Sequence, residues 1–144
     1  MDIEMFGKIS DAFGPSGFEE EVVRTVAGYC GKYQVENDAM NNLYVRMPGR
    51  AGDKPVVQLD AHLDEIGFVV TGHEEGYLKF APLGGVDPRM LPDRELTVLT
   101  DPPLAGVVAC LPPHVQTRED MDKSIPIREL CLDVGLSQEG AERR

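Results

Sequence analysis

Apolar residues recur every three to four positions at the start of the chain, which predicts an amphipathic helix. Ile3, Phe6, Ile9 and Phe13 form its apolar side. The segment Gly14-Pro15-Ser16-Gly17 then interrupts the pattern, because glycine and proline disfavour a continuing helix.

A second helix is predicted directly after this break. Ser16 and Glu19 have the spacing of a capping box, in which each side chain accepts a hydrogen bond from a free amide at the start of a helix. Gly31 stands where a helix end favours a residue that tolerates positive φ. The apolar face between them consists of Val22, Val23, Val26, Ala27 and Cys30.

The pattern then changes to the alternation of apolar and polar residues that is typical of strands. Residues 34–38 and 43–47 are predicted to be two strands joined by a turn at 39–42. A short apolar strand at 55–59 runs directly into the polar segment 60–65. Ligands of open α/β sheets bind at the carboxyl ends of strands, so this end is the first candidate site.

After residue 65 the chain consists of short apolar segments separated by glycine and proline, which predicts a small β domain. We therefore expect two parts, residues 1–66 and residues 67–144. A helix is predicted to begin at Ser137. The chain ends only about two turns into this helix, which we interpret as truncation of the chain. The predicted strands of the second part are residues 66–71, 77–82, 95–100, 105–111 and 125–130.

Composition and charge exclude several classes of function. With 25 acidic and 14 basic residues the net charge is −11, which disfavours binding to nucleic acid or to an anionic membrane surface. The apolar runs are strand-sized, and the N-terminus lacks the features of a secretory signal, so we expect a cytoplasmic protein. The three cysteines are widely spaced and form no C-x-x-C pair, which predicts buried or free thiols.

The sharpest candidate for chemistry is His62-Leu63-Asp64-Glu65. Residues two apart in an extended segment point to the same side, so His62 and Asp64 share one face. Such a pair suits a metal ligand and the carboxylate that orients it. An ordinary charged surface turn is the alternative. His73 and His114 lie in segments that read as a hairpin turn and a loop, and we assign them no role.

Two segments taken in order resemble signature blocks of a known family of zinc aminopeptidases. This metallo-aminopeptidase family includes glutamyl aminopeptidase and the deblocking and tetrahedral aminopeptidases, and some members carry an endoglucanase M-like label. The two blocks are residues 14–20, Gly-Pro-Ser-Gly-Phe-Glu-Glu, and residues 60–68, Asp-Ala-His-Leu-Asp-Glu-Ile-Gly-Phe. Shorter landmarks follow in the family's order at residues 84–88, 106–108, 112–114 and 132–135.

The resemblance implies the N-terminal part of an α/β peptidase core, followed by an inserted β-rich domain that is PDZ-like or barrel-like and serves dimerisation. It implies that His62 is a ligand of one of two divalent ions, zinc or cobalt, and that Asp64 is the catalytic-site acid that orients it. Peptide substrates and a homo-oligomer are implied as partners. Two positions depart from the family's pattern: Asn41 stands where glycine is usual, and Val86 stands where tryptophan is usual.

The remaining metal ligands and the general base of the family normally lie further along the chain than residue 144. One histidine does not complete a zinc site, which usually needs about three protein ligands. Two hypotheses follow. The sequence belongs to an aminopeptidase that hydrolyses N-terminal residues from peptides, or the 144-residue chain is an inactive fragment that acts in association or as half of a split enzyme. In either case we expect exposed apolar faces and self-association.

Overall fold

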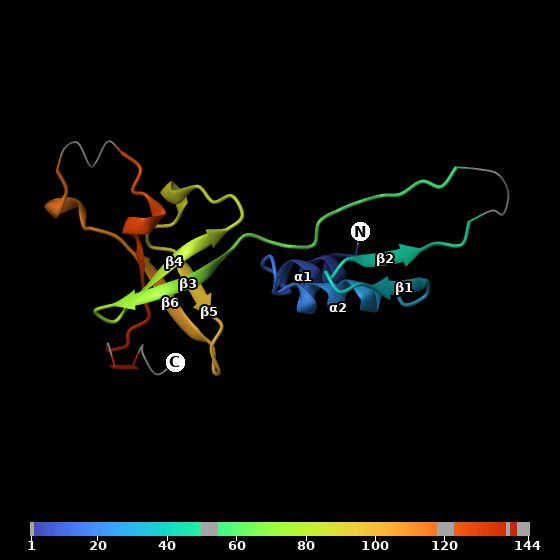
Figure 1. Ribbon diagram of the computed structural model, residues 1–144, viewed down its shortest axis with the longest axis horizontal. Helices are drawn as coiled ribbons and strands as arrows, with labels where there is room; N and C mark the ends of the chain where they lie inside the picture. The colour runs from blue at the N-terminus through green and yellow to red at the C-terminus, as the bar shows by residue number, and fades with distance from the viewer. Residues whose placement is uncertain (1, 50–54, 118–122, 138, 141–144) are drawn as a thin grey trace. The chain divides into compact units, whose positions relative to one another are not determined.

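The computed structural model describes residues 2–49, 55–117, 123–137 and 139–140. The chain is a mixed α/β protein with two compact units, Met1–Glu65 and Ile66–Arg144 (Figure 1). Among the described residues, the first unit contains two α-helices and a two-stranded sheet, and the second contains a five-stranded sheet. None of the described helices is long and apolar enough to cross a membrane.

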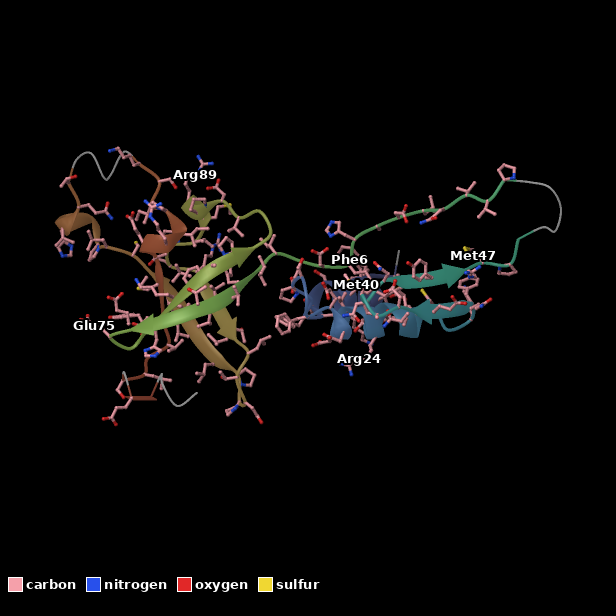
Figure 2. The ribbon with its side chains drawn as sticks, viewed as in Figure 1. Phe6, Arg24, Met40, Met47, Glu75 and Arg89 are labelled. Carbon is pink, nitrogen blue, oxygen red and sulfur yellow. The ribbon has the colours of Figure 1, made fainter. Side chains whose placement is uncertain are left out.

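The two helices predicted at the start of the chain are present. Asp2 caps the first by accepting a hydrogen bond from the Met5 amide at 3.1 Å. Val22 and Val23 of the second are buried, whereas the first has no fully buried residue. Phe6 on the first helix is exposed to solvent (Figure 2). The helices are α1 (Ile3–Asp11) and α2 (Glu20–Tyr29).

The capping box predicted for α2 is wrong. The residue before the helix is Glu19, whose side chain makes no cap hydrogen bond. Instead its carboxylate accepts from the Gly17 amide at 2.6 Å, and the Ser16 hydroxyl donates to the distant Asp64 carboxylate. Gly31 does follow the helix, but it does not adopt the positive φ that was predicted for it. At the start of α2, the hydrogen bond from Ser16 to Asp64 replaces the predicted cap.

The predicted hairpin forms from β1 (Gln34–Asn37) and β2 (Leu43–Arg46), which pair antiparallel. In the turn the Asp38 carboxylate accepts from the backbone amides of Met40 and Asn42, each at 2.9 Å. Asn41 has a φ of 60°. This conformation favours glycine and is tolerated by asparagine, so Asn41 can stand where glycine is usual in the resembled family.

The strand predicted at residues 55–59 does not form within the described part of the chain. The backbone there is extended (Figure 1), but it pairs with no described strand. Val56, Val57 and Leu59 are 95%, 81% and 92% exposed. Apolar residues on both sides of an extended segment are typical of a strand covered on both faces. An extended segment becomes a strand only when a second strand pairs with it, and the apolar pattern does not show whether such a partner is present.

The second unit is an antiparallel sheet with the strand order β3-β4-β7-β6-β5. Its core is one cluster of six buried side chains, Leu78, Phe80, Leu91, Val108, Leu130 and Leu132. Val86, where tryptophan is usual in the resembled family, packs partly buried against this cluster. The strands are β3 (Gly67–Glu74), β4 (Tyr77–Leu83), β5 (Glu95–Val98), β6 (Leu104–Ala109) and β7 (Cys131–Asp133).

Four of the five strands predicted for this unit are present, and the fifth is misplaced. Instead of a strand at 125–130, the 3₁₀ helix η3 (Ile127–Glu129) follows Pro126, whose carbonyl accepts from the Glu129 amide at 2.9 Å. Proline has no amide to donate to a ladder, and the Leu130 amide donates to the Ile127 carbonyl at 3.0 Å, so the strand begins only at Cys131. Leu132 then pairs with Leu78 on one side and Val108 on the other.

The remaining elements are short. Two further 3₁₀ helices, η1 (Pro88–Met90) and η2 (Pro113–Val115), lie in the loops between strands. Most of the helix predicted to begin at Ser137 lies outside the described residues. Its first turn is partly visible, since the Ser137 hydroxyl accepts a hydrogen bond from the Gly140 amide at 3.3 Å.

The ion pair of Asp87 and Arg89 gives a testable pH dependence. The Arg89 guanidinium and backbone amide hold the pKa of Asp87 at about 2, below the usual value near 3.9. Its stabilising effect is therefore fully present above about pH 4 and is lost as the pH falls towards 2. We expect Arg89→Gln to return the Asp87 pKa towards its usual value, as measured by a carboxyl-carbon NMR titration. Arg94→Gln removes a guanidinium that donates to the Met90 carbonyl at 3.2 Å and is not among the groups that lower the Asp87 pKa, so it should leave that pKa unchanged.

Candidate metal centre

The two candidate residues, His62 and Asp64, lie on the extended segment that leads to the end of the first unit. This segment is anchored at Glu65, which forms a parallel bridge with Pro15. The Glu65 amide donates to the Gly14 carbonyl at 2.9 Å, and the Glu65 carboxylate accepts from the Gly14 amide at 3.2 Å. The two sequence blocks 14–20 and 60–68 are thus in direct contact.

His62 and Asp64 do face each other, as the two-residue spacing predicted. The His62 Nδ1 atom is 2.9 Å from the Asp64 carbonyl oxygen and 3.3 Å from the Asp64 Oδ1 atom. Both neighbours are hydrogen-bond acceptors when the carboxyl group is ionised, so the contact is favourable only if Nδ1 carries a proton. In a neutral ring this leaves Nε2 with a free lone pair, which is the form that binds a metal ion.

Asp64 has a second partner that the sequence did not indicate. The Ser16 hydroxyl donates to the Asp64 Oδ2 atom at 2.6 Å. This hydrogen bond is the largest cause that lowers the pKa of Asp64, and the neighbouring His62 ring lowers it further. Asp64 therefore stays ionised near neutral pH and keeps its acceptor role towards the imidazole.

The site is open to solvent. The His62 side chain is 86% exposed and the Asp64 side chain 40%. No hydrogen bond to the Nε2 atom occurs within the described residues, so this atom is accessible to a cation. Among the described residues, no group of three histidine, cysteine or acidic side chains lies close enough together to hold a metal ion. The donor chemistry fits one ligand of a divalent ion together with the carboxylate behind it.

His62 and Asp64 lie on the wall of a broad hollow in the first unit. One side of the hollow is formed by the hairpin around β2, from Met40 to Met47, and the other by the extended segment from Val56 to Asp64. Met40 and Met47 are exposed (Figure 2). The hollow is therefore bordered by uncovered apolar side chains as well as by the candidate ligand.

The other two histidines lie away from this pair along the chain. His73 is exposed on β3, and its neighbour Glu74 forms an ion pair with Lys79 at 3.6 Å. His114 is exposed within η2. Both belong to the second unit, and neither gathers with two further potential ligands among the described residues. They remain without a role.

Sequence reasoning missed Ser16 as a member of this site. Its spacing to Glu19 suggested a helix cap, and its partner Asp64 lies 48 residues further along the chain. A usable signal was nevertheless present, because Ser16 and Asp64 stand in the two blocks that carry the family resemblance. The resemblance points to both blocks together, but it does not say that Ser16 and Asp64 are in contact.

Comparisons with known proteins confirm the family resemblance. A family profile described as M42 glutamyl aminopeptidase matches residues 41–144. The chain is 32% identical over 143 residues to a lysyl aminopeptidase of Pyrococcus furiosus, covering 95% of this chain and 40% of that protein. A TET aminopeptidase from a marine-sediment thaumarchaeon superimposes with a TM-score of 0.87 at 33% identity, over 98% of this chain and 40% of that one.

A further solved structure matches the chain and has a described assembly. The TET1 peptidase of Pyrococcus horikoshii, which assembles into a tetrahedron or a large octahedral shell, superimposes with a TM-score of 0.78 at 35% identity. The match covers 98% of this chain and 43% of that one. The chain thus spans about 40% of the length of the proteins it resembles.

Proposed function

The chain belongs to the M42 glutamyl aminopeptidase family, and we propose that it supplies the N-terminal part of a metal-dependent aminopeptidase acting on peptides. The observation that carries this proposal is the His62–Asp64 pair. Its Nδ1 contacts leave the Nε2 atom of an exposed imidazole free for a metal ion. In this proposal residues 1–66 belong to the peptidase core, and residues 67–144 form a β-rich insertion.

His62 would be a ligand of one of two divalent ions, and Asp64 would hold its ring in the binding tautomer. Ions bound at such a site supply Lewis-acid polarisation of a carbonyl and an activated water. The carboxylate behind the ligand raises its basicity and fixes its orientation. The ligands that complete the site come, in this proposal, from residues that are not part of the 144-residue chain.

A second candidate function is association without catalysis. The β unit has a hydrophobic core of its own, and the first unit exposes Val56, Val57 and Leu59. The related P. horikoshii peptidase can assemble into a tetrahedron or a large octahedral shell. A chain with one metal ligand and an intact β unit would retain self-association, or would pair with a second polypeptide that completes the site. We expect either form in the cytoplasm.

Zinc titration of the chain, followed by NMR of the histidine rings, tests the metal role. We expect the Nε2 resonance of His62 to respond at lower zinc concentration than those of His73 and His114. Among the described residues, only His62 has a carboxylate oxygen as close as 3.3 Å to its Nδ1 atom. His62→Ala should remove this response, whereas His73→Ala should retain it. Equal responses of all three rings would contradict a ligand role for His62.

Hydrolysis of a panel of aminoacyl p-nitroanilides, with and without zinc or cobalt, separates the two functions. We expect no metal-dependent turnover from the folded 144-residue chain, because one histidine leaves the metal under-coordinated. Turnover that His62→Ala abolishes and His73→Ala preserves would establish peptidase activity and overturn our placement of the remaining ligands. Absence of turnover together with oligomers in light scattering would favour association.

A further inference from the structure

We propose that Ser16 is a positioning residue of this centre: its hydroxyl holds Asp64, which in turn holds the His62 ring with Nε2 free. That this arrangement keeps Nε2 free for a metal ion rests on the proposed function. The arrangement itself is a property of the metal-free chain and can be measured without any metal.

The side chains of Ser16, Asp64 and His62 are in continuous contact, and the Asp64 carbonyl oxygen, 2.9 Å from the His62 Nδ1 atom, is a further acceptor for the same proton. The two oxygens of the Asp64 carboxylate face different partners, since Oδ2 accepts from the Ser16 hydroxyl at 2.6 Å and Oδ1 lies 3.3 Å from the His62 Nδ1 atom. A hydrogen bond to an ionised acceptor is stronger and more directional than one between neutral groups. Rotation of the carboxylate away from the imidazole would therefore break the bond to Ser16 as well.

The Ser16 hydroxyl has no part in the local structure described around it. It does not cap α2, which begins at Glu20 after a residue that makes no side-chain cap bond. The loop turns at Gly17, whose φ of 90° suits glycine, and the Gly17 amide bonds the Glu19 carboxylate. None of these features uses the Ser16 hydroxyl, whose hydrogen bond goes to Asp64.

The backbone around Ser16 is held independently of its side chain. Two hydrogen bonds between Gly14 and Glu65, at 2.9 and 3.2 Å, fix the loop against the segment that carries Asp64. Removal of the hydroxyl should thus leave the loop in place and free only the carboxylate. Ser16 is also exposed, so the additional methyl group of threonine can be accommodated there.

The test measures the tautomer of the His62 ring. Long-range proton–nitrogen NMR spectra of the 144-residue chain at a pH of about 8.5, roughly two units above the ordinary histidine pKa, report which nitrogen carries the proton. We expect the Nδ1–H form to dominate at His62. Ser16→Ala should lower the ratio of Nδ1–H to Nε2–H by about threefold or more, since a charge-assisted hydrogen bond is lost. Ser16→Thr should retain the original ratio.

Zinc affinity provides a second readout. Changes in the groups that support a ligand typically weaken metal binding by about 10–100-fold. Because Ser16 acts one step further away, we expect about threefold to tenfold weaker zinc binding at His62 in Ser16→Ala and an unchanged affinity in Ser16→Thr. The tautomer signals of His73 and His114 should be the same in all variants. These two rings therefore control for structural changes that are not specific to His62.

The outcomes separate this proposal from the proposed function. A tautomer shift in Ser16→Ala without any zinc response at His62 would support the positioning role and contradict the metal role. An unchanged tautomer ratio and zinc affinity in a folded Ser16→Ala chain would overturn the positioning role and leave the metal role intact. If Ser16→Ala does not fold, Asp64→Ala decides, because it removes the carboxylate acceptor and leaves only the backbone carbonyl of residue 64 near Nδ1, so the ratio should shift in the same direction. An unshifted ratio in Asp64→Ala would overturn the proposal.

Discussion

Leu130→Ala is expected to lower the free energy of unfolding of the β unit by about 2–5 kcal/mol, because it empties part of a closely packed core. Leu130 is 1% exposed and is the largest fully buried side chain of the described residues. It belongs to the single cluster that also contains Val108 and Leu132. For a unit of this size the loss is a large part of the total stability, which is about 0.05–0.15 kcal/mol per residue.

Amide hydrogen exchange resolved by mass spectrometry measures this effect separately in each unit. Peptides from β6 and β7 should exchange faster in Leu130→Ala, while peptides from α2 should be unaffected. Leu99→Ala is the matched control, since Leu99 is 56% exposed and its truncation should change stability by about 0.5 kcal/mol or less. Equal effects of the two variants would contradict the core position of Leu130.

Gly14→Ala is expected to destabilise the first unit by about 1–3 kcal/mol. A Cβ atom at this position would lie 2.5 Å from the Val22 Cγ1 atom and 3.2 Å from the Val22 Cβ atom. Val22 is buried, so it has little room to move. The displaced loop would carry Ser16 away from Asp64, and the tautomer of His62 should shift together with the loss of stability.

Gly7→Ala is the control for this substitution and should have the opposite sign. Gly7 lies within α1, and a Cβ atom there would meet nothing within 4 Å. Alanine in a helix interior is more favourable than glycine by about 0.5–1 kcal/mol. Urea unfolding followed by α2 amide exchange measures both variants. A stabilising Gly14→Ala would contradict the close contact between the loop and α2.

The features that the sequence predicted correctly depend on neighbours along the chain. The periodicity of Ile3, Phe6 and Ile9 identifies α1, and the turn residues between the alternating segments identify the β1–β2 hairpin. The His62–Asp64 contact is also local, because a spacing of two residues in an extended segment places both side chains on one face. The family match followed from such local blocks as well.

The features that the sequence predicted wrongly depend on partners that are distant along the chain. Ser16 has the spacing of a cap, but the Asp64 carboxylate binds its hydroxyl. Residues 55–59 have the composition of a buried strand, but an extended segment becomes a strand only where a neighbour pairs with it, and no described strand does so. The misplaced last strand is a different, local error, because the turn of η3 that follows Pro126 occupies the amides of Glu129 and Leu130.

The sequence by itself determined the helices, the hairpin, four strands of the β unit, the family and the pairing of His62 with Asp64. Local hydrogen bonds and side-chain periodicity are encoded within a few residues, so they can be read without a structure. Only the tertiary structure decided that the Gly14–Ser16 loop docks on Asp64 and Glu65 and that Leu132 bridges β4 and β6. These contacts depend on which surfaces of a folded chain meet, and one sequence carries no distances between segments 48 residues apart.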